Sequence, residues 1–294
     1  MEAKLSPRLG IVILLVAASC FAANHVCARV AFDHGASVAA AVMARAAVTA
    51  IVLLAFLRLQ GVAFAVPRAL RARLAIAGLL LVVQSYCIYS ALTLIPVALA
   101  LLVFQTSTML YLLLAWSMGR EKPSVAALLP MLLALAGLAL ALDLRPAQFT
   151  LRWQEMGVGV GLSFISAVSS ALIYYSNAYA LKEVDGRLRT LVMTGVVALV
   201  ALFGGVATDA LAAPRDGTGW FAITLLTVFY CIAITTIFVV VPRVAPASTA
   251  ALNFEPIALL GLGWVVLGQA VTPLQVVGAF ITVGAIAWLG MAKK

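Results

Sequence analysis

Residues 95–119 read IPVALALLVFQTSTMLYLLLAWSMG, and residues 245–268 read APASTAALNFEPIALLGLGWVVLG. Each stretch begins with a proline close to its start, and Pro96 and Pro246 lie 150 residues apart. A tryptophan follows each proline at nearly the same distance. Similar segments therefore recur about half a chain apart, and each half of the chain holds five apolar segments.

The composition is that of a protein whose solvent is lipid. The chain has 294 residues, of which 65% are hydrophobic and 10% are charged, whereas soluble domains carry about 25% charged residues. A membrane-spanning helix needs about 20 apolar residues. The sequence predicts an all-α polytopic membrane protein with ten transmembrane helices, over residues 10–32, 37–59, 74–94, 96–118, 124–143, 157–180, 190–209, 219–241, 246–268 and 273–291.

The recurrence divides the chain into a five-helix repeat over residues 1–143, an outer connecting loop over 144–156 and a second five-helix repeat over 157–294. A unit with an odd number of spans must enter the membrane from the opposite side when it occurs again. The two repeats are therefore predicted to be inverted. Inverted repeats are typical of secondary transporters, which bind substrate near the membrane midplane between the repeats.

The positive charge is distributed unequally between the two membrane faces. With the N-terminus in the cytoplasm, the outer face receives Arg145, Arg152 and Arg215. The inner face receives fourteen cations: Lys4, Arg8, Arg58, Arg68, Arg71, Arg73, Arg120, Lys122, Lys182, Arg187, Arg189, Arg243, Lys293 and Lys294. This positive-inside bias predicts a multi-pass protein with both termini cytoplasmic. It explains the net charge of +9 by orientation and lipid contact, without a nucleic-acid partner.

Ionisable residues inside spans are candidates for function, because charge in hydrocarbon costs several kcal/mol. Glu255 is the foremost, since it lies inside a predicted span and is followed by Pro256, which would free the carbonyl near Leu252. It is a candidate proton-coupling residue, and a structural carboxyl at a helix kink is the alternative. Arg45 in the second span could bind an anion in the pathway, but a structural role, capping carbonyls or pairing with an acid, is the favoured interpretation.

Other polar and aromatic residues in the spans are candidates for binding substrate. His25 could relay protons, because histidine gains and loses a proton near neutral pH, or it could simply donate a hydrogen bond to a neighbour. Amides at depth either join helices or bind a polar solute, and aromatic walls with a few amides suit a small amphipathic metabolite or an organic cation. The predicted substrate-binding set is Asn24, His25, Gln84, Tyr86, Phe104, Gln105, Tyr174, Asn177, Tyr230 and Asn253.

Metal, nucleotide and enzyme chemistry find little support in the sequence. The four cysteines lie in spans with no metal-site spacing, and no phosphate-binding loop is present, so ATP is not expected to drive transport. No metal site and no cofactor are predicted. An intramembrane enzyme would need clustered acids, bases or ligands, so the protein is not expected to be an enzyme.

Several motifs carry a resemblance to a known family. The segment Phe21-Ala22-Ala23-Asn24-His25-Val26 followed by Arg29 resembles the first helix of EamA-domain proteins, which belong to the drug/metabolite transporter superfamily. Pro96 through Gly119-Arg120-Glu121 resembles the family's fourth helix, and Asn253-Phe254-Glu255-Pro256 through Leu267-Gly268 resembles its ninth. Arg45 falls where the family often has an arginine. One departure is that Gln105-Thr106 occupies the first-half position of Glu255-Pro256.

The resemblance implies a ten-helix carrier of the bacterial inner membrane with a central cavity, similar to bacterial exporters of amino acids and related metabolites. The expected function is secondary export of small amphipathic metabolites, amino acids and aromatic amino acids among them, by alternating access. The alternatives are a multidrug or organic-cation exporter, a nucleotide-sugar carrier and, more distantly, an intramembrane enzyme or lipid scramblase. The expected partners are a small-molecule substrate and membrane lipid. The sequence does not predict an oligomeric state, and a monomer is one of the alternatives.

Overall fold

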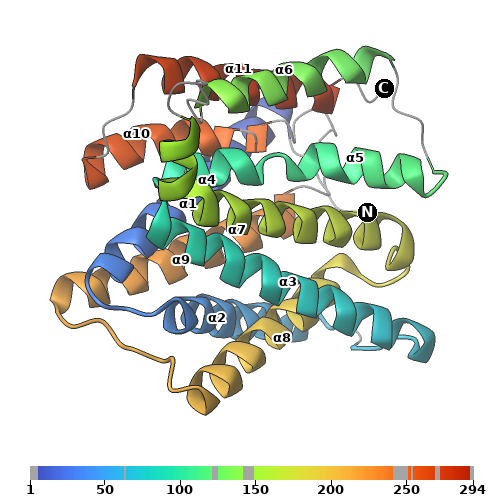
Figure 1. Cartoon of the computed structure of the whole chain (residues 1–294). Coiled ribbons are helices and arrows are strands. Elements are labelled where there is room, and N and C mark those ends of the chain that lie inside the picture. Colours follow the sequence, from blue (N-terminus) through green and yellow to red (C-terminus); the bar gives the residue numbers. More distant parts are fainter. Residues whose placement is uncertain are drawn as a thin grey trace.

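The computed structural model describes residues 6–62, 64–120, 125–141, 149–240, 251–252, 254–268 and 272–291. Every regular element within these ranges is helical, which confirms the predicted all-α class (Figure 1). The elements are α1 (Pro7–Asp33), α2 (Val38–Leu59), α3 (Arg68–Leu94), α4 (Val97–Phe104), α5 (Ser107–Ser117), α6 (Val125–Ala141), α7 (Phe149–Tyr175), the π-helical turn η1 (Ser176–Ala180), α8 (Gly186–Ala207), α9 (Gly217–Val240), α10 (Glu255–Leu267) and α11 (Pro273–Met291).

The helices have the length and surface of a multi-pass membrane protein. Seven candidate spans are long and apolar enough to cross a membrane: Arg8–Asp33, Val38–Leu59, Arg68–Leu94, Val97–Ser117, Met156–Ala180, Gly186–Ala207 and Gly217–Ile237. Shorter apolar helices cover Leu129–Leu140, Glu255–Leu267 and Pro273–Ala285. Large apolar side chains point outward from many helices, including Leu59, Val158 and Trp264. Soluble proteins rarely expose apolar patches of this extent, so these faces are suited to lipid.

Caps and prolines at the helix ends explain several boundaries. The hydroxyl of Ser37 accepts a hydrogen bond from the N–H of Ala40 at 3.1 Å and caps α2, which satisfies an end donor that has no partner within the helix. Pro67 and Pro96 stand immediately before α3 and α4. Proline has no N–H to donate, so it is readily accommodated at a helix start.

Several helices begin earlier than the apolar pattern predicts, α3 and α7 by the most residues. α3 begins at Arg68 instead of residue 74, and its first turns carry the exposed Arg71 and Arg73. α7 begins at Phe149, so residues 149–156, predicted as part of the connecting loop, are helical. Hydropathy detects only the segment that suits hydrocarbon, whereas a helix continues beyond it with polar residues at its ends.

Two predicted spans differ in their interior. The predicted span 96–118 is found as the candidate span Val97–Ser117, but its helix is interrupted by a turn at Gln105 and Thr106 between α4 and α5. In the predicted span 246–268, the part before residue 251 lies outside the described residues, and α10 begins at Glu255 with Pro256 in its first turn. Glu255 is therefore at a helix start instead of a helix interior. Pro256 frees no carbonyl within a helix, because its position needs no donor.

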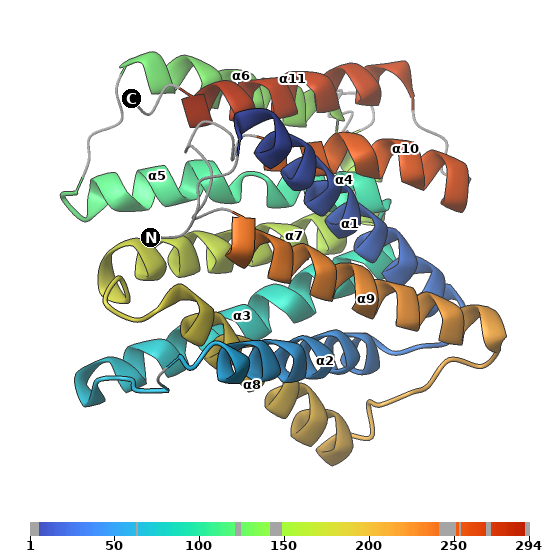
Figure 2. The same cartoon turned by 180° about the vertical axis from the view of Figure 1, so that it is seen from behind.

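The helices pair across the two halves of the chain. α1 packs against α9, α3 against α7, α2 against α8 and α6 against α11, while α10 lies against α1 and α4. Both views place α6 and α11 along one edge of the molecule and α2 and α8 along the opposite edge (Figures 1 and 2). The main buried cluster joins α1, α3, α4, α9 and α10 around Tyr89, Leu101, Leu226 and Leu259.

Candidate functional site

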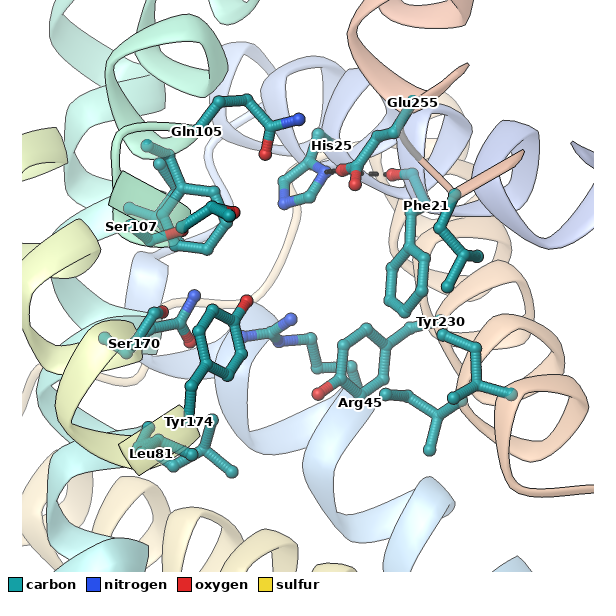
Figure 3. A pocket seen from close by; sticks show the side chains of 18 residues that line it. Phe21, His25, Arg45, Leu81, Gln105, Ser107, Ser170, Tyr174, Tyr230 and Glu255 are labelled. Carbon is teal, nitrogen blue, oxygen red and sulfur yellow. Dashed lines mark hydrogen bonds and ion pairs between the residues drawn. The ribbon is translucent and has the colours of Figure 1, made fainter. Parts of the chain in front are cut away.

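A cavity of about 380 Å³ lies among helices from both halves of the chain. This volume falls at the small end of the range of roughly 300–1,000 Å³ that is usual for small-molecule sites. Figure 3 shows its labelled side chains arranged around an open centre. It is lined by Phe21, His25, Arg45, Leu81, Gln84, Ile88, Phe104, Gln105, Ser107, Thr108, Ser170, Ile173, Tyr174, Tyr230, Ile234, Ile237, Leu252 and Glu255.

Polar side chains at a helix joint and at a helix start line this cavity. The first is the joint between α4 and α5, where Gln105 lines the cavity and the Thr106 hydroxyl donates to the carbonyl of Val103 at 2.7 Å. Such side-chain bonds to nearby carbonyls compete with helical hydrogen bonding. The second is the start of α10, where Glu255 lines the same cavity. Gln105 and Glu255 thus come from different halves of the chain and meet at one site.

The imidazole of His25 faces the carboxyl group of Glu255. Its Nδ1 lies 2.9 Å from the carbonyl oxygen of Phe21 and 3.4 Å from Oε1 of Glu255. A carbonyl can only accept, so Nδ1 carries the proton in this arrangement and donates it to Phe21, with the Glu255 carboxyl group nearby. The pair is almost fully buried, with side-chain exposures of 10% for His25 and 17% for Glu255. It is a site where a proton can be held between two groups inside the apolar body.

Arg45 forms the opposite side of the cavity (Figure 3). Its guanidinium carbon lies 4.2 Å from the ring centre of Tyr89 and 4.3 Å from that of Tyr230. Contacts of this kind between a cation and a ring face contribute about 0.5–2 kcal/mol, more when water is excluded. Arg45 is only 4% exposed, and its buried Nε has no hydrogen-bond partner among the described residues. The expected structural partners, an acid or capped carbonyls, are likewise not found in the part of the chain that the structure describes.

A buried chain of hydrogen bonds fixes one of the two rings. The hydroxyl of Tyr89 donates to Oδ1 of Asn24 at 2.9 Å, and Nδ2 of Asn24 donates to the carbonyl of Leu226 at 2.7 Å. Both Asn24 and Tyr89 have 0% exposure. Asn24 thus joins α1 to α3 and α9 behind the cavity wall, and through Tyr89 it supports the position of Arg45.

The cavity contains most, but not all, of the predicted site residues. It brings together His25, Gln84, Phe104, Gln105, Tyr174 and Tyr230 from the substrate-binding set, along with Arg45 and Glu255. Asn24, Tyr86 and Asn177 are not in its lining: Tyr86 packs beside the main core, and Asn177 lies in η1. Asn253 lies outside the described residues. Direct substrate contact remains a prediction for every member of the set.

Several lining residues were absent from the predicted set. They include Phe21, Ser107, Thr108, Ser170 and a group of isoleucines. Ser163, Ser166 and Ser170 follow one another at spacings of three and four residues on α7 and are all buried. This helical spacing places them on one face and is a signal that the sequence did contain.

Loops at one end of the molecule are tied together by polar contacts. Nδ1 of His34 lies 2.7 Å from Oδ2 of Asp216, and the Ser37 hydroxyl accepts from the N–H of Ala212 at 3.0 Å. Hydrogen bonds from the N–H of Gly219 and from His34 hold the pKa of Asp216 below its ordinary value. These contacts join the loop between α1 and α2 to the loop between α8 and α9.

A corresponding contact joins the loops at the other ends of α2 and α8. Asp185 caps α8 by accepting from the N–H of Arg187 at 2.8 Å, and Nη1 of Arg187 donates to Oε1 of Gln60 at 2.6 Å. Hydrogen bonding to the Arg187 side chain holds the pKa of Asp185 below its ordinary value. Each end of the α2–α8 pair is thus linked by side chains of adjoining loops.

Part of the chain matches a known protein family. Residues 8–142 match the sequence profile of the EamA-like transporter family. Over these residues the chain is similar to EamA-like transporters. The resemblance inferred from the sequence motifs is confirmed over these residues, and this part of the chain contributes Arg45, His25 and Gln105 to the cavity.

A structural comparison finds a similar fold over nearly the whole chain. A solved crystal structure of a protein superposes with a TM-score of 0.66, covering 98% of this chain and 99% of that one at 18% identity. At this identity the likeness concerns the fold alone. A comparison with curated proteins gave no match.

Proposed function

We propose that this EamA-like protein is a secondary transporter that exports small amphipathic metabolites, amino acids and aromatic amino acids among them, by alternating access. EamA-like proteins are membrane transporters, and the observation that carries the proposal is the cavity. It lies inside a body of apolar helices, draws its walls from both halves and combines apolar side chains with a few polar ones. That combination is typical of small-molecule sites.

The proposal includes two inverted five-helix repeats, giving ten spans in total. In this proposal each helix of the first half has an equivalent in the second: α1 corresponds to α7, α2 to α8, α3 to α9, the α4–α5 segment to α10, and α6 to α11. If each helix is replaced by its equivalent, the α1–α9 contact becomes the α7–α3 contact, and the α2–α8 and α6–α11 contacts are unchanged. All four contacts are present in the structure. This symmetry of contacts supports the repeats, and inverted repeats provide the two access states of a secondary transporter.

The His25–Glu255 pair is the candidate for coupling transport to a proton. Both groups are largely buried, and the His25 Nδ1 lies 2.9 Å from the carbonyl oxygen of Phe21 and 3.4 Å from Oε1 of Glu255. Ionisable residues within spans commonly mark proton and substrate paths. We propose that a proton binds at this pair in one access state and leaves in the other, in a bacterial inner membrane with both termini in the cytoplasm.

Transport in proteoliposomes tests the function. Purified protein is reconstituted and preloaded with amino acids, aromatic amines or a nucleotide sugar, and exchange of each labelled solute is measured. The proposal expects exchange of at least one amphipathic amino acid and none of the nucleotide sugar. Exchange of organic cations alone would favour the multidrug alternative. Absence of exchange for every solute, together with lipid movement or modification in a parallel assay, would favour the scramblase or enzyme alternatives.

A further inference from the structure

The ionisable groups of the cavity are separated in space. Among the described lining residues, Arg45 is the cation and Glu255 the carboxylate, with His25 beside the carboxylate. Figure 3 shows Glu255, His25 and Gln105 on one side of the open centre and Arg45 with Tyr230 on the other. The cavity therefore has a negative side and a positive side.

Arg45 is arranged to bind an anionic group. The contacts with Tyr89 and Tyr230 involve the faces of the rings and the centre of the guanidinium group, and they leave its N–H groups without acceptors among the described residues. A planar guanidinium matches a carboxylate with two parallel hydrogen bonds. A buried donor without an acceptor costs about 1–3 kcal/mol, and more when it is charged. A carboxylate entering the cavity would remove that cost.

Glu255 is placed to accept a hydrogen bond from a ligand cation. It is the first residue of α10, and the positive end of a helix dipole favours a carboxylate in that position. Its Oε1 is approached by the His25 N–H at 3.4 Å, a distance longer than a normal hydrogen bond. Glu255 thus retains capacity to accept from a ligand ammonium group.

We infer that the cavity recognises a zwitterion, with the ligand carboxylate at Arg45 and the ligand ammonium at Glu255; this rests on the proposed function and specifies its substrate. Moving an ion out of water costs several kcal/mol unless an opposite charge meets it. A zwitterion compensates both protein charges, whereas an organic cation leaves Arg45 uncompensated and an organic anion leaves Glu255 uncompensated. The apolar lining, including Leu81, Ile173 and Ile234, accommodates an apolar substituent between the charged ends.

Three probes of nearly equal shape separate the two charges. L-phenylalanine is the zwitterion, 2-phenylethylamine lacks the carboxylate and 3-phenylpropanoate lacks the ammonium. Binding to detergent-purified protein is measured by calorimetry and by the rise in melting temperature that a ligand causes. We expect L-phenylalanine to bind at least tenfold more tightly than either analogue, and tenfold corresponds to about 1.4 kcal/mol.

Two substitutions should act in a crossed pattern. Arg45→Gln should remove the preference for L-phenylalanine over 2-phenylethylamine while keeping the preference over 3-phenylpropanoate. Glu255→Gln should do the reverse. Arg45→Lys keeps the charge without the planar fork and should retain a reduced preference, which also provides a result if Arg45→Gln does not fold.

The outcomes distinguish this inference from the function on which it rests. Crossed losses of preference support it, whether or not exchange occurs in proteoliposomes. It is overturned if the wild type binds the three probes equally or binds none of them, or if each substitution weakens all three probes by the same factor. Exchange of other solutes in proteoliposomes would then leave the transport function standing with a different mode of recognition.

Discussion

His25 and Glu255 come from opposite halves of the chain, and Nδ1 of one lies 3.4 Å from Oε1 of the other. The contact crosses the cavity wall between α1 and α10. It joins α1, the first helix of the chain, to the start of α10 in the second half. A proton held here belongs to both halves, and any movement between the halves would change its environment.

Replacement of Glu255 by Gln tests the coupling role. The amide keeps the shape of the side chain but cannot bind or release the proton. We expect net flux driven by a pH gradient to lose its pH dependence, while exchange of substrate survives at lower affinity. Glu183→Gln, in an exposed loop, is the matched control and should retain the pH dependence. An unchanged pH profile in Glu255→Gln would reject the coupling role.

A second acid in the cavity should alter its charge preference. Gln105 lines the same cavity as Glu255, so Gln105→Glu adds a carboxylate there with little change in volume. We expect 2-phenylethylamine to bind at least fivefold more tightly to this variant than to the wild type in calorimetry. The control is Gln154→Glu, which adds the same charge at an exposed position on α7. Equal binding by both variants would contradict the assigned position of Gln105.

Removal of the Asn24 amide should destabilise the fold and loosen Arg45. In Asn24→Ala the Tyr89 hydroxyl loses its acceptor, and the helical carbonyl of Leu226 loses its extra bond from Asn24. A buried polar group left unpaired costs about 1–3 kcal/mol, so the melting temperature in detergent should fall by several degrees. Asn177→Ala is the control, because its buried Oδ1 has no partner among the described residues. A larger loss in the control than in Asn24→Ala would contradict this account.

The contact between His34 and Asp216 should stabilise the end loops in a pH-dependent way. The pKa of Asp216 lies below its ordinary value because Gly219 and His34 donate to the carboxylate. Because the carboxyl pKa is lower in the folded state than in the unfolded state, the contact increases the free energy of unfolding above the ordinary carboxyl pKa of about 3.9. This contribution is lost as pH falls through the lowered pKa of the folded state.

Asp216→Asn should therefore speed hydrogen exchange of residues 208–219 near neutral pH, and the difference from wild type should shrink at strongly acidic pH. Asp209→Asn in the same loop is the control. Asp209 has φ of 51°, a conformation that asparagine also accepts. Equal exchange in both variants and the wild type would show that the contact contributes nothing.

Much of the helical framework could be predicted from the sequence because hydropathy and helix breakers are local signals. The start of α2 follows directly from the capping residue Ser37, and the start of α4 follows from Pro96. The interruption at Gln105 and Thr106 was missed because neither residue is a strong breaker and the surrounding run is apolar. The early start of α7 was missed because its first turns are polar and resemble a loop.

Most residue types of the site could be predicted from the sequence, but which side chains face the cavity and contact one another could not. The helices are apolar on nearly all sides, so their sequences contain no clear polar stripe that fixes which face meets the cavity. Asn24 and His25 are neighbours in sequence, yet Asn24 lies behind the wall and His25 lines it. The contact of His25 with Glu255 depends on packing between distant segments, which no local pattern contains.

A pair of tryptophan substitutions on α7 tests the central claim that transport passes through this cavity. Ser170 lines the cavity, whereas Val158 is 70% exposed on the outer surface. Exchange of labelled L-phenylalanine is measured in proteoliposomes containing Ser170→Trp or Val158→Trp, both checked for a melting temperature close to that of the wild type. The account predicts that Ser170→Trp reduces exchange at least tenfold and that Val158→Trp exchanges as the wild type does. Equal exchange by the two variants would contradict it.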